Sequence, residues 1–508
     1  MLDQPKRDLA DAPATFTGNR GLDVEELLLF EIGRAETSGV DIDEPSPFES
    51  CLDGLERKQP IGLPGLSEPE TLRHYVRLSR KNYSIDGGLY PLGSCTMKHN
   101  PRLNEKMARL EGFADIHPLQ PQSTVQGALE AMEQLTHWLL TLTNMEAVAL
   151  SPKAGAHGEI CGLMAIKSAI AARGESETRK TVLVPQSAHG TNPASAALLG
   201  FEVRAVPAGP DGVVHAEAVE ALVGPDVAAI MLTNPNTCGL FERDVAKIAK
   251  LVRDAGGYFY CDGANFNAIA GVARPGDFGV DAMHINLHKT FSTPHGGGGP
   301  GAGPVVLSAR LAPFAPAPLL IRTGEVLRLK EDAEGTQAFG RITAFHGQMG
   351  MFVRALAYML AHGGDGLAQA SRDAVLSANY VRVSLRDLMS SPFGDRKCMH
   401  EVLFDDAWLA GTGVSTLDFA KAMIDEGFHP MTIYFPLVAH GAMLIEPTES
   451  ESKASLDQFI GTLRRLGERA LEGDAALFHG APRYTPRRRL DETQAARKPV
   501  LRWSKGAA

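Results

Sequence analysis

The chain has 508 residues, of which 44% are hydrophobic and 22% charged, an ordinary balance for a globular protein long enough for two or three domains. Its 50 basic and 60 acidic side chains leave a net charge of −10, which argues against a broad nucleic-acid-binding surface, because such a surface needs clustered positive charge. No run of about 18 apolar residues and no apolar leader occurs, so we expect neither a membrane span nor a signal peptide.

The first 122 residues are rich in proline, glycine and charge and show helical periodicity only in two short stretches, 24–35 and 68–84. They contain no convincing pattern of strands. We therefore expect 1–122 to form an N-terminal arm that wraps other surfaces and ends in an active-site segment, rather than a domain with its own core.

Residues 123–325 alternate short apolar runs with longer stretches of helical periodicity, such as 218–223 and 244–257. This alternation predicts a large α/β domain with a seven-stranded, mostly parallel sheet buried on both faces. Because only glycine- and proline-rich sequence separates the last two runs, there is no room for a long helix and the last strand is expected to be antiparallel. The predicted strands are 146–152, 181–186, 201–207, 227–234, 257–263, 282–288 and 303–308.

Residues 326–508 combine a long helical pattern at 342–364 with two strand-like runs at 398–404 and 431–437. This mixture predicts a smaller C-terminal α+β domain with a tail. The three arginines at 487–489 are followed at once by acidic residues, which indicates a solvated surface or a subunit contact rather than nucleic-acid binding.

The residues that follow the predicted strands indicate one ligand site. Ligands of open α/β sheets bind outside the carboxyl ends of the strands. Polar, charged or glycine-rich segments follow five of these strands, which is more than packing requires. These segments are 153–159, 187–195, 234–239, 261–265 and 288–301.

Lys289 is the most suggestive residue at this edge. A lysine after an apolar strand usually turns to solvent, but this one lies between His288 and Thr290 and is followed by four consecutive glycines. Such a flexible segment lets backbone approach a planar ligand closely. A lysine amine shielded from water is also a nucleophile that forms imines, so we predict a Schiff base of pyridoxal 5'-phosphate on Lys289.

Asp262 ends a run that is otherwise apolar or aromatic, where a carboxylate must find a partner. A pyridinium nitrogen is one such partner, and keeping it protonated makes the cofactor an electron sink. An ordinary turn or N-cap role is the alternative. Ala264 is small enough to let one face of the ring lie flat.

His157 and His189 follow two other strands and could be structural hydrogen-bond partners. Stacking over the ring or donating to a phosphate is the functional alternative. Residues 155–158 precede a helical stretch, so their amides could cradle a phosphate with the help of the helix dipole.

Neither a metal site nor a nucleotide-binding loop is indicated. His284 and His288 are four positions apart, but on a strand that spacing spans about 13 Å, too far for one ion. The sequence has no H-E-x-x-H, no G-x-G-x-x-G after a first strand and no G-x-x-x-x-G-K-[ST]. The six cysteines form no C-x-x-C pair, so we expect neither zinc nor disulfides but reduced thiols in a cytoplasm.

Together these segments resemble the fold-type-I pyridoxal-phosphate enzymes, in which Asp-Gly-Ala-Asn is followed 27 positions later by His-Lys. A closer resemblance, from about residue 20 to Trp503, is to the P-protein family of the glycine cleavage system, and within it to subunit 2 of glycine dehydrogenase (decarboxylating). The matching motifs are GLYPLGSCTMKHNP (88–101), IHPLQPQ (116–122), AGAHGE (154–159), DGANFNAI (262–269), NLHKTFSTPHGGGGPG (286–301), CMHE (398–401), HPMTIYFPL (429–437) and IEPTESESK (445–453).

The resemblance implies a role for each matching residue. Lys289 would carry the cofactor and act with His189 in catalysis, His189 by stacking on the ring, while Asp262 would bind the pyridinium nitrogen. Asn236 or Asn265 would reach the phenolic oxygen. The phosphate would lie near Ala156, His157, Asn286 and His288. The GSCTMK stretch would line the site and the approach of a carrier arm, with a purely structural loop as the alternative; its residues of interest are Ser94, Cys95, Thr96 and Lys98.

The resemblance also implies the reaction, which is decarboxylation of glycine, release of CO2 and transfer of the aminomethyl group to the lipoyl arm of the H-protein. Single-chain members carry a cofactor-free half ahead of the half that this chain resembles. We therefore expect pairing with a separate subunit 1, as an α2β2 heterotetramer with the active site where subunits meet. Another fold-type-I enzyme, such as a cysteine desulfurase or an aldolase, and a non-catalytic scaffold subunit are the alternatives; Lys289 and Asp262 speak against the scaffold.

Overall fold

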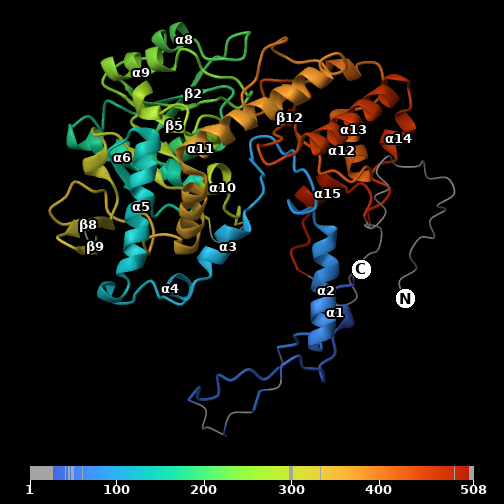
Figure 1. Cartoon of the computed structure of the whole chain (residues 1–508), viewed down its shortest axis with the longest axis horizontal. Coiled ribbons are helices and arrows are strands. Elements are labelled where there is room, and N and C mark those ends of the chain that lie inside the picture. Colours follow the sequence, from blue (N-terminus) through green and yellow to red (C-terminus); the bar gives the residue numbers. More distant parts are fainter. Residues whose placement is uncertain are drawn as a thin grey trace.

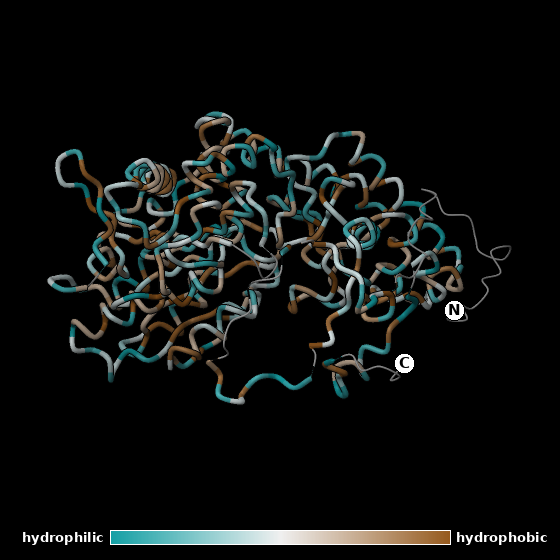
Figure 2. Tube along the Cα trace, turned by 90° about the horizontal axis from the view of Figure 1, so that it is seen from below, coloured by the Kyte–Doolittle hydropathy of each residue, from teal (hydrophilic) through white to brown (hydrophobic). Residues whose placement is uncertain are grey.

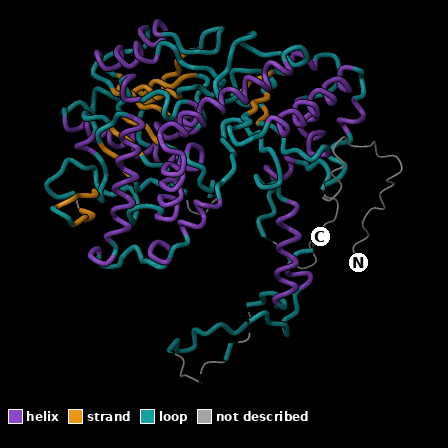
Figure 3. The backbone as a smooth tube through the Cα atoms, in the orientation of Figure 1, coloured by secondary structure: helices purple, strands orange, loops and turns teal. Residues whose placement is uncertain are grey.

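The computed structural model describes residues 27–40, 42–43, 46, 51–59, 61–296, 301–331, 333–485 and 487–502. It contains a large α/β unit, a smaller C-terminal unit and an N-terminal arm (Figure 1). The predicted fold class is confirmed, because a seven-stranded, mostly parallel sheet lies at the centre of the large unit with helices around it (Figure 3).

The strands of the central sheet run in the order β1-β7-β6-β5-β4-β2-β3, and all seven predicted runs contribute to it. Every strand is shorter than the apolar run that predicted it. The last strand, β7, pairs antiparallel with both β1 and β6, which confirms the expectation drawn from the short connection before it. The strands are β1 Ala147–Ala149, β2 Thr181–Pro185, β3 Glu202–Val206, β4 Val227–Thr233, β5 Tyr258–Asp262, β6 Ala282–His284 and β7 Val305–Leu307.

Helices cover both faces of the sheet because its central strands are apolar on both sides. In β5, Phe259 packs in one core with α5 and α9, while Tyr258 and Tyr260 pack in the other with α6 and α7. Asp262 is two residues beyond Tyr260, so it lies on the α6 side. The helices are α5 Gln126–Thr143, α6 Gly155–Ala172, α7 Thr191–Leu198, α8 Ala216–Glu220 and α9 Val245–Asp254.

The C-terminal unit is built on a small antiparallel sheet of order β10-β12-β11. Two of its strands lie within longer predicted runs, and the third, β12, was missed. Helices α12 Thr416–Asp425, α13 Lys453–Leu471 and α14 Ala475–His479 pack on its core, and α15 Glu492–Arg497 lies in the tail. The strands are β10 Val402–Phe404, β11 Thr432–Ile433 and β12 Met443–Ile445.

Helix α11, Met349–Leu385, joins the two units. The prediction of a helix at 342–364 was wrong at both ends, because the chain passes Gly363 at φ 63° and continues as a helix. The part of α11 up to Leu367 packs in the core of the large unit, whereas Ala378 to Leu385 pack in the C-terminal core. The predicted boundary at 325/326 falls between β8 Leu319–Thr323 and β9 Val326–Lys330, which form a hairpin that the sequence did not reveal.

The N-terminal arm contains α1 Leu29–Ile32, α2 Glu68–Lys81, α3 Arg102–Ala108 and α4 Glu111–Ala114. The helix predicted at 24–35 lies partly outside the described residues, and the one at 68–84 corresponds to α2. Helix α2 extends away from both units (Figure 1). Seen from below, the two units lie side by side (Figure 2). Beyond α2 the chain returns to the molecule and forms a bridge between Leu92 and Ile445 of β12. Among the helices that the structure describes, none combines the length and apolar character needed to cross a membrane.

Candidate active site

A cavity of about 480 Å³ opens at the carboxyl ends of the central strands, where the sequence predicted a site. Its volume is in the range of small-molecule sites. The cavity is lined by ten of the predicted site residues: Ser94, Cys95, Ala156, His189, Asp262, Ala264, Asn265, Asn286, His288 and Lys289. Four predicted residues do not line it: Thr96, Lys98, His157 and Asn236.

Lys289 lies in α10, Leu287–Thr290, a single helical turn after β6. The prediction of a strand through 288 was wrong, because β6 ends at His284 and the chain turns into this helix. The separation of about 13 Å expected for two positions four apart on one strand therefore does not apply to His284 and His288, and both line the cavity. The Nζ of Lys289 donates a hydrogen bond to the carbonyl oxygen of Ser94 at 2.7 Å. The N-terminal arm thus supplies the acceptor that holds this amine.

Asp262 is 3% exposed, and its carboxylate accepts two hydrogen bonds. Its Oδ1 accepts from the backbone N–H of Ala264 at 2.9 Å, and its Oδ2 accepts from Nδ2 of Asn192 at 2.9 Å. Asp262 is thus the N-cap of the 3-10 helix η3, Gly263–Ala268, and also lines the cavity. The N-cap role that the sequence left open is present in the structure, and the role as partner of a pyridinium nitrogen stays a prediction.

The surroundings of Asp262 keep it ionised. Burial alone would raise the pKa of this carboxyl, but His284, the Asn192 amide and other nearby groups outweigh burial and lower it. Burial and the neighbouring Asp262 raise the pKa of Glu159, which also lines the cavity. Of these two carboxyl groups, Asp262 is therefore the one whose pKa favours the ionised form.

His284 links Asp262 to the sheet. Its Nδ1 lies 2.7 Å from the hydroxyl of Tyr260, and its Nε2 lies 3.0 Å from Oδ1 of Asn286 and 3.4 Å from Oδ1 of Asp262. Burial raises the pKa of Tyr260 well above its usual value, so the phenol keeps its proton.

The first turn of α6 forms a cradle for an anion. A helix leaves its first amide N–H groups without intrahelical acceptors, and here Gly155 and Ala156 bring them to the cavity wall. A Cβ at Gly155 would lie 2.6 Å from Nδ2 of Asn286, so only glycine fits there. Burial, together with the nearby Lys289 and His295, lowers the pKa of His288 to about 3, so its ring is neutral.

His157 is used as a structural hydrogen-bond partner outside the cavity. Its Nδ1 accepts from the backbone N–H of Lys153 at 3.2 Å, and its Nε2 lies 3.2 Å from the carbonyl of Ile342. This is the structural alternative that the sequence left open. The structure therefore does not place its ring in contact with a phosphate bound in the cavity.

Of the two asparagines proposed for the phenolic oxygen, only Asn265 lines the cavity. Its Oδ1 is buried and has no hydrogen-bond partner among the described residues, while its Nδ2 donates to the carbonyl of Pro235 at 2.9 Å. Asn236 instead fixes its own turn, with Nδ2 donating to Glu242 and Oδ1 accepting from the N–H groups of Cys238 and Leu240.

His189 lies at the mouth of the cavity, where Thr191 and Phe435 surround it. Its Nδ1 is 2.9 Å from Oγ1 of Thr191, and its ring meets that of Phe435 edge to face at 5.6 Å. The position is compatible with stacking over a ring in the cavity, and the stacking role stays a prediction.

The GSCTMK stretch divides into two parts. Ser94 and Cys95 line the cavity, whereas Thr96 and Lys98 are buried outside it. The Nζ of Lys98 donates to Oε1 of Glu449 at 2.6 Å and to Oδ1 of Asn267 at 2.8 Å. Lys98 therefore connects the N-terminal arm to both units by these hydrogen bonds.

Several residues of the site were missed by the sequence prediction, although some stand inside the motifs quoted above. Glu159 closes AGAHGE and accepts hydrogen bonds from the hydroxyls of Thr191 and Ser195 at 2.7 and 2.8 Å. A glutamate near the start of a strongly apolar helix is the signal that could have indicated it. Other lining residues that were missed are Lys153, Thr191, Thr233, Thr237, His284 and His295.

Two groups of possible metal ligands occur among the described residues, His215 with Glu217 and Asp244, and His400 with Glu401 and Glu446. The sequence indicated no metal. In the first group Asp244 already pairs with Lys247 and His215 with Asp211. Neither group lines the cavity, and the absence of a metal stays a prediction.

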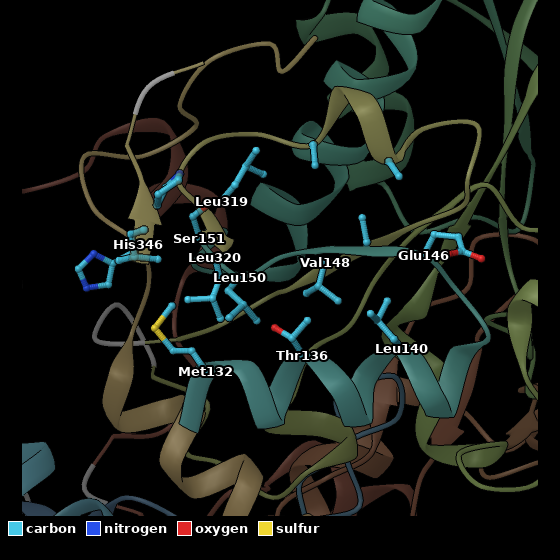
Figure 4. A pocket seen from close by; sticks show the side chains of 15 residues that line it. Met132, Thr136, Leu140, Glu146, Val148, Leu150, Ser151, Leu319, Leu320 and His346 are labelled. Atoms are coloured by element: carbon cyan, nitrogen blue, oxygen red, sulfur yellow. The ribbon is translucent and has the colours of Figure 1, made fainter. Parts of the chain in front are cut away.

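A second cavity, of about 240 Å³, lies at the β1 edge of the sheet between α5 and β8 (Figure 4). Its walls are mainly apolar, with Met132, Leu140, Val148 and Leu320 among them. No lysine lines it, so it cannot hold a cofactor by an imine.

The residues of the first cavity fit pyridoxal phosphate on the chemistry of their donors and acceptors. An amine, an ionised carboxylate and a glycine-rich helix start converge on one space. The unpartnered oxygens of Asn265 and Thr233 are buried beside the same space, where a bound polar molecule would satisfy them.

Two family models match the chain, class-V aminotransferases over residues 161–308 and the glycine dehydrogenase C-terminal domain over residues 370–474. The class-V match confirms the predicted cofactor, pyridoxal phosphate. Among solved structures, an inhibitor-bound crystal structure of glycine decarboxylase (P-protein) of the glycine cleavage system matches with a TM-score of 0.69 at 20% identity, covering 82% of this chain and 94% of that one. A cysteine desulfurase from Escherichia coli matches with a TM-score of 0.57 at 15% identity, covering 75% and 95%. At these identities the structures establish the fold.

The sequence relatives are much closer. A protein of Caulobacter vibrioides called probable glycine dehydrogenase (decarboxylating) subunit 2 is 66% identical over 505 residues, which is 99% of this chain and 96% of the relative. A protein of the same name from Kosmotoga olearia is 50% identical over 91% of this chain and 95% of the relative. Identity this high over nearly the whole length leaves one assignment: the chain belongs to the family of glycine dehydrogenase (decarboxylating) subunit 2.

Proposed function

We propose that the chain catalyses the pyridoxal-phosphate-dependent decarboxylation of glycine. The single observation that carries this proposal is the juxtaposition of the Lys289 amine and the ionised Asp262 carboxylate across one cavity, in a chain whose relatives are named for that reaction. The family supplies the substrate, and the geometry supplies the residues.

Some residues hold the cofactor, and others keep its ring nitrogen protonated. Pyridoxal phosphate, when bound, accepts the electrons left behind when a carboxylate departs as CO2. Asp262 holds a proton on the ring nitrogen, and His284 and Asn192 keep Asp262 ionised and oriented. The first turn of α6 binds the phosphate, and Lys289 provides the amine for covalent attachment.

The proposal includes a partner, because the name subunit 2 implies a subunit 1. The arm is the part of this chain suited to hold it. Helix α2 extends away from both units and leaves large apolar side chains in solvent, which is costly unless another chain covers them (Figure 1). These include Leu72, Tyr75 and Val76. An α2β2 assembly, the lipoylated H-protein as acceptor of the aminomethyl group, and a cytoplasmic location complete the proposal.

The test is exchange of labelled bicarbonate with the carboxyl group of glycine, measured with subunit 1 and lipoylated H-protein present. The wild-type chain should support exchange, and Lys289→Ala should not. The alternative of a cysteine desulfurase has the same fold in its favour, so sulfide release from cysteine is measured in parallel. Sulfide release without bicarbonate exchange would overturn the proposal.

A further inference from the structure

The turn formed by Ser94, Cys95 and Thr96 has an unusual backbone. Ser94 has φ 66° and Thr96 has φ 47°, both in the left-handed region that residues other than glycine rarely adopt. Such conformations persist only where surrounding contacts hold them, and they gather at functional sites. The contacts that hold this turn therefore matter for the site that it lines.

Two buried glutamates of the C-terminal unit hold the turn. The Oε2 of Glu401 accepts from the backbone N–H of Ser94 at 2.7 Å. The carboxylate of Glu446 accepts twice from Thr96, from its backbone N–H at 3.0 Å and from its hydroxyl at 2.5 Å. Both glutamates are fully buried, Glu401 directly before β10 and Glu446 directly after β12.

Ser94 carries the effect of these contacts to the reactive amine. Its N–H donates to Glu401, and its carbonyl accepts from the Nζ of Lys289 at 2.7 Å. One residue thus connects a carboxylate of the C-terminal unit to the amine of the large unit. Glu401 and Lys289 are thus linked through the backbone N–H and the carbonyl of one residue, Ser94.

The neighbouring groups show why the glutamates serve as a clamp rather than as a cation site. Glu401, Glu446 and His400 bring their ligand atoms within 4.8 Å of one another, but three of the four carboxylate oxygens already accept bonds from the turn. Burial lowers the pKa of His400 to about 3 and raises that of Glu446 to about 7. Burial, with the neighbouring Glu446, raises the pKa of Glu401 well above its usual value. Lys289 is the cation whose charge lowers the pKa of both carboxyl groups.

We propose that Glu401 and Glu446 are positioning residues, which fix the Ser94–Thr96 turn and, through the Ser94 carbonyl, the place of the Lys289 amine. The proposal rests on Lys289 being the cofactor-bearing residue, and it makes the C-terminal unit part of the active site. Its test measures the turn itself rather than turnover, so its failure is distinguishable from failure of the proposed reaction.

Cys95 reports the state of the turn. It is partly buried in the middle of the turn, and burial raises the pKa of its thiol in spite of the nearby Lys289, so alkylation in the wild type should be slow. The exposed Cys51 in the same molecule provides an internal standard. The experiment compares the iodoacetamide alkylation rates of the two thiols by peptide mass spectrometry in the full chain, with and without pyridoxal phosphate.

The variants separate a specific clamp from general loss of stability. Glu401→Ala should raise the Cys95 rate relative to Cys51 by about tenfold or more, because it leaves the buried N–H of Ser94 without its acceptor. Glu401→Gln should stay within about threefold of wild type, because its amide oxygen still accepts from Ser94. The matched control is Glu242→Ala, which removes an equally buried glutamate that contacts Asn236 and Val214 rather than the turn, and it should leave the Cys95 rate unchanged.

The second readout is reductive methylation of Lys289 by formaldehyde and cyanoborohydride in the cofactor-free chain. This rate should rise in Glu401→Ala together with the Cys95 rate. If Glu401→Ala does not fold, Thr96→Val removes only the hydroxyl donor to Glu446 and should raise the Cys95 rate about threefold. Unchanged rates of Cys95 alkylation and Lys289 methylation in a folded Glu401→Ala would overturn the proposal, as would an equal rise of the Cys95 rate in Glu242→Ala. If Glu401→Ala does not fold, an unchanged Cys95 rate in Thr96→Val would overturn it.

Discussion

Replacing Asp262 with asparagine should abolish most of the activity while leaving the fold intact. Asparagine has nearly the same shape, but it cannot keep a ring nitrogen protonated. It also puts an NH2 group where one of the two oxygens now accepts from Ala264 or Asn192, each at 2.9 Å. Loss of the protonated ring nitrogen lowers activity, and loss of the hydrogen bond lowers stability.

The magnitude follows from the burial of the site. Asp262 is 3% exposed, and breaking a buried charged pair costs about 3–5 kcal/mol, which corresponds to a fall of about 10²–10⁴-fold in the rate of glycine–bicarbonate exchange. The lost hydrogen bond should lower the free energy of unfolding by about 1–3 kcal/mol.

Asp281→Asn is the matched control. Asp281 is 1% exposed on the same sheet and accepts hydrogen bonds from Phe259, Ser308 and Arg310, but it does not line the cavity. Both variants should lose similar stability in denaturant unfolding, and only Asp262→Asn should lose exchange. Exchange within about threefold of wild type in Asp262→Asn would refute the role assigned to this carboxylate.

Three further predictions concern the phosphate cradle, a buried glutamate and the arm. Gly155→Ala should weaken cofactor binding about tenfold in an absorbance titration, because its Cβ would meet a side chain at 2.6 Å, whereas Gly127→Ala, with nothing within 4 Å, should not; equal affinities would contradict the cradle. Burial raises the pKa of Glu242 from 4.5 to about 7, so the folded state holds a proton that the unfolded chain releases and stability falls as pH rises from about 4.5 to 7. Glu242→Gln should remove its share of that fall, about 3 kcal/mol, in denaturant unfolding at several pH values, and an unaltered pH profile would contradict the shift. Leu72→Ser with Tyr75→Ser, at side chains 63% and 54% exposed, should weaken binding of subunit 1 in sedimentation without lowering the unfolding temperature, and unchanged binding would exclude α2 from the interface.

The sequence predicted the sheet well because its strands carry unbroken apolar runs. In β4 all seven residues are buried, and such a run leaves little choice of structure. The three-residue strand β12 was missed, whereas β1, β6, β7 and β10 are equally short but lie within longer predicted runs. Gly363 misled the helix prediction because a glycine can end a helix or only kink it, and packing on two cores decides which.

The candidate site was predictable where function and strand order coincide, as for Asp262 and Lys289. Residue type alone did not distinguish Asn265, which lines the cavity, from Asn236, which is consumed by its own turn. Nor could it show that the ring of His157 turns away from the cavity. The glutamates that hold the Ser94 turn lie more than 300 positions along the chain from it, and only the folded structure brings them together.

The most direct test of the account is to locate the covalent attachment of the cofactor. The chain saturated with pyridoxal phosphate is reduced with borohydride and digested, and the modified lysine is identified by mass spectrometry. The account predicts modification of Lys289, and none at Lys153, which also lines the cavity, or at the buried Lys98. Modification at Lys153 with an unmodified Lys289 would contradict it.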